Sequence, residues 1–495
     1  MSRFSWFDGS LVGCYLLVTM VAGITVRKYV GKVEHFLVAG REMNVYLGIA
    51  SLAATEFGIV TCMYTAQNGY DKGFSGATPG ILMALAMFVV GWTGFCVKPL
   101  REAGVITIPE LFETRYGKGI RCLSGVVIVL GGLLNMGVFL RTGGEFLVTV
   151  CGLEARYLEI SMTILLVAVL VYTILGGMLS VLITDFLQFV VMSVGLLAVT
   201  VFILNKIGWN ALTTAVFKNY GQGGFNPFVH PDMGWQYVLF NALLNFAVVL
   251  TWQTTIQRVL SSKDAQTGQR IYLGTSFFFV CRFLIPGLWG IAALATISPS
   301  LIGGNTLHAM PLFLGTMVPT GLMGILIAAM LAADMSTDSS YMLAWASVIY
   351  NDIVSPFRKK AWTEKRGLFW NRAIVAWIGI FLLFYGLWYP LKGDLWTYLG
   401  VTGTIYLSSM SVLLISCCYL KRANNWGAAG AIIVGAVVPV GFLVLEQLPA
   451  TEKMASRIGP YYSGIATYLL AGLAMVVGSL LKPARPVLVA QPLNR

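Results

Sequence analysis

The amino-acid sequence predicts an all-α polytopic membrane protein. Of its 495 residues, 57% are hydrophobic and only 11% are charged, and the mean hydropathy is +0.78. Soluble domains contain about 25% charged residues, so the composition excludes a soluble fold. Apolar runs long enough to cross a bilayer recur from one end of the chain to the other. We therefore expect one membrane domain over residues 1–495, without an appended soluble domain.

Thirteen apolar runs are long enough to form transmembrane helices. They lie at 6–26, 46–68, 77–98, 122–150, 158–176, 179–205, 236–253, 273–297, 317–349, 373–390, 396–419, 427–447 and 461–481. The first run ends in Arg27-Lys28 and has no small-residue cleavage site. This indicates a retained helix rather than a removed signal peptide.

The basic residues predict the orientation of these helices. With the N-terminus outside, the segments on the cytoplasmic side hold 23 Lys and Arg residues, and the outer segments hold 8. Cytoplasmic loops are enriched in Lys and Arg, so we expect an outer N-terminus and a cytoplasmic tail at 482–495, in a bacterial inner membrane. The net charge of +12 follows from this bias and from the anionic inner leaflet. It does not indicate a nucleic-acid partner.

The sequence contains no catalytic or metal-site motif. His35, His230 and His308 fall in separate loops, and the eight Cys residues show no paired spacing. We therefore do not expect an enzyme. Polar side chains instead interrupt the apolar runs, which is typical of a pathway for a solute.

The ninth run carries four hydroxyl groups close together. At 100° per residue, Ser336, Thr337 and Ser340 share a stripe with the small Ala333, and Ser339 lies at its edge. Hydroxyl and carbonyl oxygens are hard ligands that suit an alkali cation. The alternative is that these hydroxyls bond back to their own helix or to neighbouring helices. Four hydroxyls beside one small residue favour a cation site.

The same run contains two carboxylates one turn apart, Asp334 and Asp338. A charge at the centre of a membrane helix costs roughly 2.5–3.5 kcal/mol, and two like charges repel. The pair therefore needs a proton, a cation or a basic partner. Arg282 and Arg141 are the two basic residues inside other apolar runs, and both are candidates. A structural ion pair or a water-lined vestibule is the alternative.

Other charged residues also interrupt apolar runs. Glu56 stands in the second run, just before Gly58, where small residues would permit a break in the helix. Asp185 stands in the sixth run. Arg141 and Glu145 in the fourth run are four residues apart, which predicts a local ion pair, with solute contact as the alternative.

Five segments resemble the signature blocks of the sodium/solute symporter family. They are HFLVAGREM (35–43), ITIPELFETRYG (106–117), YTILGGMLSVLITDFLQ (172–188), TIQRVLSSKDA (255–265) and LAADMSTDSSYMLAWASVIYNDI (331–353). The family includes sodium/glucose, sodium/proline and sodium/sialic acid cotransporters, and the resemblance covers residues 34–420. It implies a core of the leucine-transporter type, with inverted five-helix repeats at 46–205 and 236–419, an extra helix at 6–26 and two more at 427–481. The predicted orientation agrees, because the second run points outward and the seventh inward.

The resemblance also implies site residues. The main sodium site would use the backbone carbonyls of Ala54, Phe57 and Ala333 and the hydroxyls of Ser336 and Thr337. A second sodium site, present in some members, would use Asp185, Ser336, Ser339 and Ser340. The solute would lie near Glu56, Thr61, Asn245 and Trp252, and Tyr64 and Trp252 would act as gates.

The chain departs from the family at its acidic positions. Glu56 matches an Asp of the proline-transporting members, and Asp334 and Asp338 replace residues that are usually apolar. An acidic solute site favours an ammonium-bearing solute, or a proton as the coupled ion. Arg141 together with Glu56 would suit a zwitterion such as an amino acid.

These features predict a secondary active symporter that couples inward sodium movement to uptake of a small polar organic solute, such as an amino acid or a sugar, by alternating access. A proton-coupled symporter and a non-transporting sensor on the same fold are the alternatives. A channel is less well supported, because no ring of filter residues repeats. The co-transported sodium ion is the only cofactor expected, and the sequence specifies neither the solute nor an oligomeric state.

Overall fold

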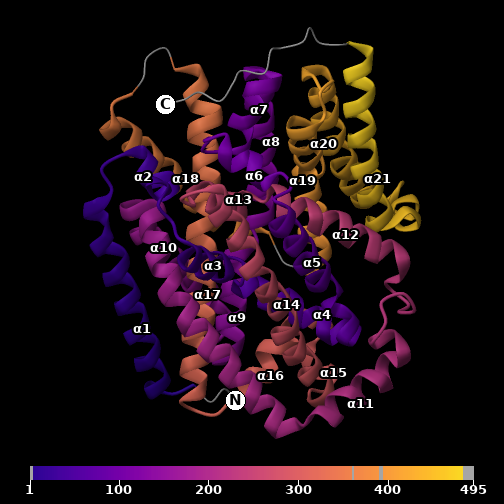
Figure 1. Cartoon of the computed structure of the whole chain (residues 1–495). Helices are drawn as coiled ribbons and strands as arrows, with labels where there is room; N and C mark the ends of the chain where they lie inside the picture. The colour runs from indigo at the N-terminus through magenta and orange to yellow at the C-terminus, as the bar shows by residue number, and fades with distance from the viewer. Residues whose placement is uncertain (1–3, 359–361, 390–393, 483–495) are drawn as a thin grey trace.

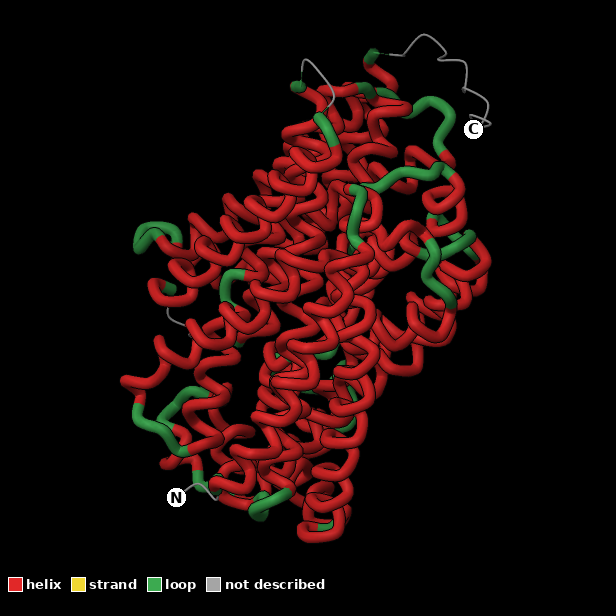
Figure 2. The backbone as a smooth tube through the Cα atoms, turned by 90° about the vertical axis from the view of Figure 1, so that its left-hand side faces the viewer, coloured by secondary structure: helices red, strands yellow, loops and turns green. Residues whose placement is uncertain are grey.

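The computed structural model describes residues 4–358, 362–389 and 394–482. Within these ranges the regular structure is helical and contains no strand (Figures 1 and 2). The first half of the chain forms α1 Trp6–Thr25, α2 Val33–Val38, α3 Val45–Thr55, α4 Ile59–Lys72, α5 Thr78–Thr93, α6 Val97–Glu102, α7 Ile108–Tyr116, α8 Lys118–Met136, α9 Phe139–Cys151, α10 Leu158–Ile207 and α11 Trp209–Tyr220. The second half forms α12 Gly234–Thr251, α13 Gln253–Ser261, α14 Ala265–Thr296, α15 Pro299–Ile302, α16 Ala309–Met317, α17 Leu322–Val348, α18 Glu364–Trp388, α19 Leu395–Tyr419, α20 Asn425–Gln447 and α21 Glu452–Leu481.

Eleven helical segments of the described residues are long and apolar enough to cross a membrane. The predicted count of thirteen is therefore not confirmed. Two fusions account for the difference. The predicted spans 158–176 and 179–205 lie in one segment, Ala155–Ile207, and the second half of the span 46–68 continues into the span 77–98 as Ile59–Thr93.

The long helix α10 turns back on itself at Gly177. This residue has a φ of 54° and a ψ of −148°, and a Cβ there would lie 2.5 Å from the ring of Phe36, so only glycine fits. Thirteen residues of straight helix span about 20 Å. Yet the Tyr172 hydroxyl donates to the Met335 carbonyl at 2.8 Å, and Asp185 accepts from Ser336 at 2.6 Å. The two arms of α10 therefore lie where two separate spans were predicted.

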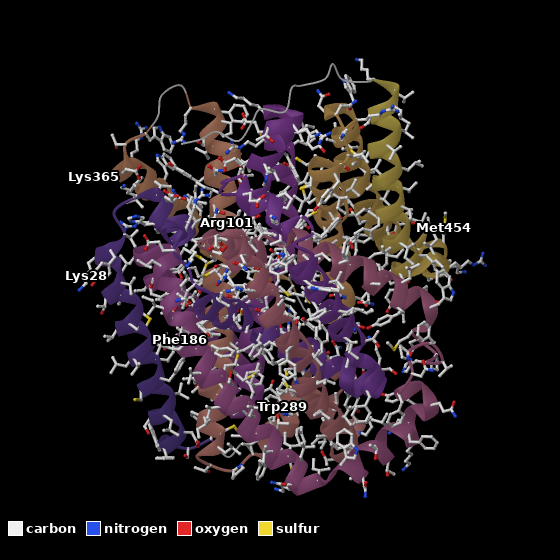
Figure 3. The ribbon with its side chains drawn as sticks, in the orientation of Figure 1. Lys28, Arg101, Phe186, Trp289, Lys365 and Met454 are labelled. Carbon is white, nitrogen blue, oxygen red and sulfur yellow. The ribbon has the colours of Figure 1, made fainter. Side chains whose placement is uncertain are left out.

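Helix α17 forms the centre of the molecule. Every residue from Leu326 to Val348 is buried, including its polar residues. At the periphery, α1 lies at one side and the paired helices α20 and α21 lie at the opposite side (Figure 1). Outward-facing side chains are apolar. Phe186 on α10 is 48% exposed, whereas Trp289 on α14 is fully buried (Figure 3). This pattern is that of a bundle surrounded by lipid, with its polar residues inside.

Candidate functional site

The second predicted span is broken in its middle, as expected. Helix α3 ends at Thr55, and α4 begins at Ile59. Gly58 in the break touches α17, because a Cβ on it would lie 2.5 Å from the Thr337 hydroxyl oxygen. The Thr337 hydroxyl is 2.7 Å from the Thr55 carbonyl and 3.0 Å from the Ala333 carbonyl. Three neutral oxygens from two helices therefore converge at the break.

The other residues of the predicted main sodium site lie around this point. The Ala54 carbonyl accepts from the Phe57 N–H at 3.2 Å. The Ser336 hydroxyl donates to Asp185 at 2.6 Å. The Ser339 hydroxyl bonds back to the Ser336 carbonyl at 3.1 Å, which is the local role that a helical Ser often has.

The cluster predicted as a second sodium site contains an arginine. Arg258 of α13 has no exposed side-chain surface, and its guanidinium lies 3.0 Å from the Asp185 carboxylate. It also donates to the hydroxyls of Ser340, Thr55 and Ser51. A buried positive charge therefore contacts Asp185 and Ser340, two of the four residues assigned to the second sodium ion.

Sequence reasoning missed Arg258 and counted it among the loop residues after the seventh run. One feature of the sequence could have revealed it, because the polar segment Gln253–Ser261 follows the apolar run without a turn residue. In the structure all nine residues of this segment are buried in α13. Contacts between backbone groups of Met43 and those of Ser261 and Lys263 hold the end of α13 against the segment before α3. Such long-range pairing is not visible in the sequence of α13 alone.

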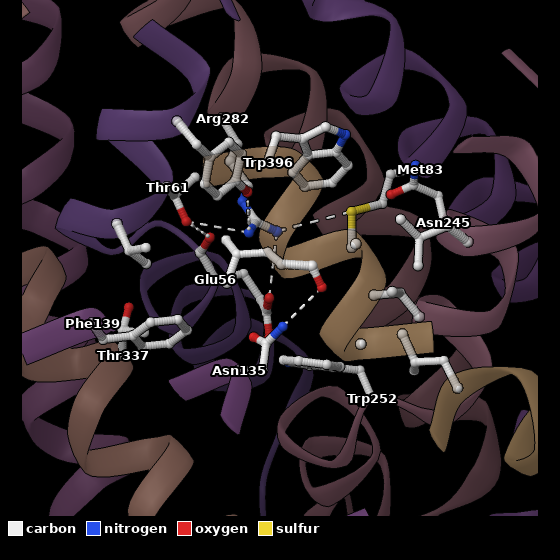
Figure 4. Close-up of a pocket in the computed structure, with 18 of the residues that line it drawn as sticks. Glu56, Thr61, Met83, Asn135, Phe139, Asn245, Trp252, Arg282, Thr337 and Trp396 are labelled. Atoms are coloured by element: carbon white, nitrogen blue, oxygen red, sulfur yellow. Dashed lines mark hydrogen bonds and ion pairs between the residues drawn. The ribbon is translucent and has the colours of Figure 1, made fainter. Parts of the chain in front are cut away.

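A cavity lies beside the helix break (Figure 4). All five residues predicted to contact solute line it, namely Glu56, Thr61, Tyr64, Asn245 and Trp252. The structure adds four polar lining residues, Asn135, Arg282, Thr337 and Tyr341. It also adds an apolar set, which consists of Val60, Met83, Phe139, Leu244, Val248, Trp396, Leu399, Gly400, Gly403 and Leu407. Binding cavities are typically apolar with a few polar groups that fix orientation.

The cavity contains one ion pair, between Glu56 and Arg282, at 3.4 Å. Arg282 also donates to the hydroxyls of Thr61 at 3.2 Å and Tyr64 at 2.8 Å. Glu56 accepts from the Thr254 hydroxyl at 2.7 Å. Glu56 therefore follows the end of α3 and faces a positive charge from α14.

Neither of the two basic candidates for Asp334 and Asp338 pairs with them in the described part of the chain. Arg282 pairs with Glu56, and Arg141 pairs with Glu145 of its own helix at 2.9 Å, as the spacing predicted. Within the described residues, one carboxylate oxygen of each Asp has no hydrogen-bond partner.

Helical spacing alone could not show where these groups point. Asp334 lies against Gly143 of α9, where a Cβ would be 2.9 Å from its carboxylate. The Arg141 guanidinium also bonds the Gly386 carbonyl at 3.0 Å and does not line the cavity. The arginine beside Glu56 is therefore Arg282 and not Arg141.

Another ion pair, between Lys72 and Asp394, lies where α19 begins. Lys72 at the end of α4 is 2.8 Å from Asp394, which caps α19 two residues before Trp396. Burial alone would raise the pKa of Asp394, but the adjacent Lys72 charge and hydrogen bonds lower it more, so the pKa lies below its usual value. The pair connects α4 to α19.

Comparison with known proteins agrees with this architecture. The sequence model of the sodium:solute symporter family matches residues 36–435. The chain belongs to the sodium:solute symporter family. Sodium/glucose cotransporter 1 of Oryctolagus cuniculus is 26% identical over 488 residues, covering 89% of this chain and 72% of that protein. Sodium/glucose cotransporter 4 of Danio rerio is 25% identical, covering 90% and 73%.

A solved structure shows the same fold. A Na+-coupled sialic acid symporter in a substrate-bound outward-open state superposes with a TM-score of 0.82 over 98% of this chain and 99% of that chain, at 18% identity. The predicted fold class, an all-helical core of the leucine-transporter type, is confirmed. The repeat boundaries 46–205 and 236–419 stay a prediction. The protein is an integral membrane protein that carries out sodium-coupled solute symport.

Proposed function

We propose that one sodium ion binds where α17 meets the break between α3 and α4, and that it drives uptake of the solute held in the adjacent cavity. The observation that carries this proposal is the convergence of the Thr337 hydroxyl with the carbonyls of Thr55 and Ala333. Ala54, Phe57 and Ser336 complete the proposed ligand set. Neutral oxygens of this kind replace the hydration shell of an alkali cation.

The ion would connect two parts of the molecule that move relative to each other. Thr55 lies on α3 and Thr337 on α17, so a cation between them favours the conformation in which both helices approach. Solute binding beside Glu56 then adds contacts across the same break, and the two ligands favour each other's binding. Rocking of one repeat against the other would release both on the cytoplasmic side.

A single coupled ion is sufficient for accumulation. We count a single ion, because the Arg258 guanidinium lies against the Asp185 and Ser340 oxygens of the second predicted site. A membrane potential of about 100 mV contributes roughly 2.3 kcal/mol per charge. One sodium ion therefore supports about a 50-fold gradient of a solute without net charge, from the potential alone.

Counterflow in proteoliposomes tests this function. Purified protein is reconstituted into vesicles that contain unlabelled solute, and entry of labelled solute is followed in sodium chloride and in choline chloride. Counterflow that requires sodium supports the proposal. Counterflow that is equal in choline, or is driven by a pH gradient instead, would contradict sodium coupling. Binding of solute without any counterflow would indicate a sensor on the same fold.

A further inference from the structure

The ion pair in the cavity is incomplete. Charge-assisted N–H···O bonds between arginine and a carboxylate are usually about 2.7–2.9 Å long, whereas Arg282 and Glu56 are 3.4 Å apart. The Arg282 Nε is buried and has no hydrogen-bond partner within the described residues. A buried donor without an acceptor is unfavourable by about 1–3 kcal/mol. An added acceptor beside Arg282 would therefore bind favourably.

The rest of the Arg282 side chain is held in place. Its guanidinium lies over the rings of Phe279 and Phe283, at 5.4 and 5.8 Å from their centres. Hydroxyls of Thr61 and Tyr64 accept from one of its terminal nitrogens. Because the cation is already oriented, a carboxylate that binds it loses little free energy to ordering the site.

The cavity also offers an acceptor that has no donor. The Asn245 side chain donates its N–H to the Asn241 carbonyl of its own helix at 2.8 Å, so its oxygen is the free atom. That oxygen is buried, and no hydrogen bond to it is found in the described part of the chain. Asn245 and Glu56 both line the cavity (Figure 4). A solute with N–H donors would satisfy the Asn245 oxygen and the Glu56 carboxylate.

The remaining lining restricts the solute further. The two charges of the cavity cancel, so a solute of net charge zero leaves no uncompensated charge in the membrane interior. Trp252, Tyr341, Trp396 and Phe139 form much of the wall and suit an apolar group. A bare anion would meet Glu56, and a bare cation would meet Arg282. An uncharged sugar would leave both charges with their present weak contact.

We propose that the solute is an amino acid with an apolar side chain, carried as a zwitterion. Its carboxylate binds Arg282, and its ammonium group binds Glu56 and Asn245. This inference rests on the proposed function, in that the cavity beside the helix break is taken as the solute site. The solute separates the Glu56–Arg282 pair and completes the hydrogen bonds of both residues.

Matched analogues test the charge requirement. The melting temperature of the purified protein in sodium chloride is measured with each of the twenty common amino acids, and with glucose. Each apolar amino acid is compared with two analogues that lack one charged group. For valine, these are isovalerate, which lacks the amine, and isobutylamine, which lacks the carboxylate. For phenylalanine, they are phenylpropionate and phenethylamine. Stabilisation by an apolar amino acid and not by its two analogues supports the proposal. It is overturned if no amino acid stabilises the protein, or if one analogue works as well as its amino acid.

Two substitutions distinguish binding from folding. Arg282→Gln is expected to weaken binding of the amino acid at least about 30-fold, the scale for truncating one partner of a buried charge pair, and to weaken binding of the amine much less. Glu56→Gln is expected to weaken binding of the amino acid and to weaken binding of isovalerate much less. The preference for valine over isovalerate therefore falls. Unchanged preference ratios in both variants would overturn the assignment, because a general folding defect affects all ligands alike.

The Arg141–Glu145 pair provides the control. It is also an arginine–carboxylate pair in a membrane helix, with side chains 19% and 13% exposed, but it does not line the cavity. Arg141→Gln and Glu145→Gln are expected to leave the preference ratios within about twofold. Sodium-dependent stabilisation and uptake of glucose, without any response to amino acids, would overturn the zwitterion and leave the proposed function intact. Counterflow without sodium dependence would instead contradict the proposed function.

Discussion

Two buried arginine–carboxylate pairs lie at the break between α3 and α4, and they differ in how complete they are. In the pair Arg258–Asp185, each side chain is fully buried and the contact is 3.0 Å. Every nitrogen of Arg258 has an acceptor, including the Ser51 hydroxyl and the Thr254 carbonyl. We call this the closed pair.

The pair Arg282–Glu56 is the open pair. Its contact is 3.4 Å, one nitrogen of Arg282 has no partner among the described residues, and both residues line the cavity. Adjacent residues of α3 serve the two pairs, since the Thr55 hydroxyl accepts from Arg258 and Glu56 meets Arg282. A saturated pair has no remaining capacity for a ligand, whereas an unsaturated pair beside empty space does. The closed pair therefore has a structural role, whereas the open pair has the free capacity that the proposed solute would use.

Removing one member of the closed pair should have the largest effect. Asp185→Asn leaves Arg258 buried without its counter-charge and is expected to lower the free energy of unfolding by about 3–5 kcal/mol. Glu56→Gln in the open pair is expected to lower it by less than half as much, because Arg282 keeps its contacts to Thr61 and Tyr64. Unfolding of the detergent-purified variants measures both. Equal losses in the two variants would remove the distinction between the pairs.

Gly58 lets the break between α3 and α4 lie close to α17. A Cβ at this position would lie 2.5 Å from the Thr337 hydroxyl and 3.0 Å from its Cβ, so Gly58→Ala forces the break away from α17. Overpacking of this kind costs typically about 1–3 kcal/mol, and we expect the loss chiefly in sodium-dependent stabilisation. Gly13→Ala is the control, because a Cβ there meets nothing within 4 Å. A Gly58→Ala variant with normal sodium dependence would contradict this role of the break.

The Thr337 hydroxyl should decide the affinity of the protein for sodium. Thr337→Ala removes an oxygen that contacts both the Thr55 and Ala333 carbonyls, and we expect the sodium concentration for half-maximal uptake to rise about tenfold, corresponding to about 1.4 kcal/mol. Ser347→Ala removes a hydroxyl of the same helix whose one hydrogen bond within the described residues is to its own Ala344 carbonyl, at 2.7 Å. That variant should resemble the unaltered protein. Equal effects from the two substitutions would show that Thr337 has no special role.

The pair Lys72–Asp394 should have the smallest effect on stability, and that effect should depend on acid pH. Because the folded pKa of Asp394 lies below its usual value, its contribution is present above about pH 4 and is lost as the pH falls through the folded pKa. The Asp394 side chain is 30% exposed, so we expect about 1 kcal/mol or less. Melting temperatures between pH 3 and pH 7 should fall less steeply for Asp394→Asn than for the unaltered protein. Parallel pH profiles would contradict this contribution.

The sequence predicted the fold well, because composition and apolar run length depend on local properties. It also predicted the break at Glu56 and the local pair Arg141–Glu145, which depend on near neighbours in the chain. It left the partners of Asp334 and Asp338 open, with Arg282 and Arg141 as basic candidates that pair elsewhere. It also missed Arg258. Those contacts join helices far apart in sequence, and helical periodicity gives the face of a residue but not the helix that this face meets.

The number of sodium ions that bind to each chain tests the central claim most directly. The claim is that the closed pair already contains its cation, in the form of Arg258, and that the oxygens at the helix break take the only coupled ion. Binding of radioactive sodium to the purified protein, titrated to saturation, gives this number. The account predicts one sodium ion per chain, with binding weakened in Thr337→Ala. Two sodium ions per chain, with one lost on substitution of Asp185 or Ser340, would contradict it.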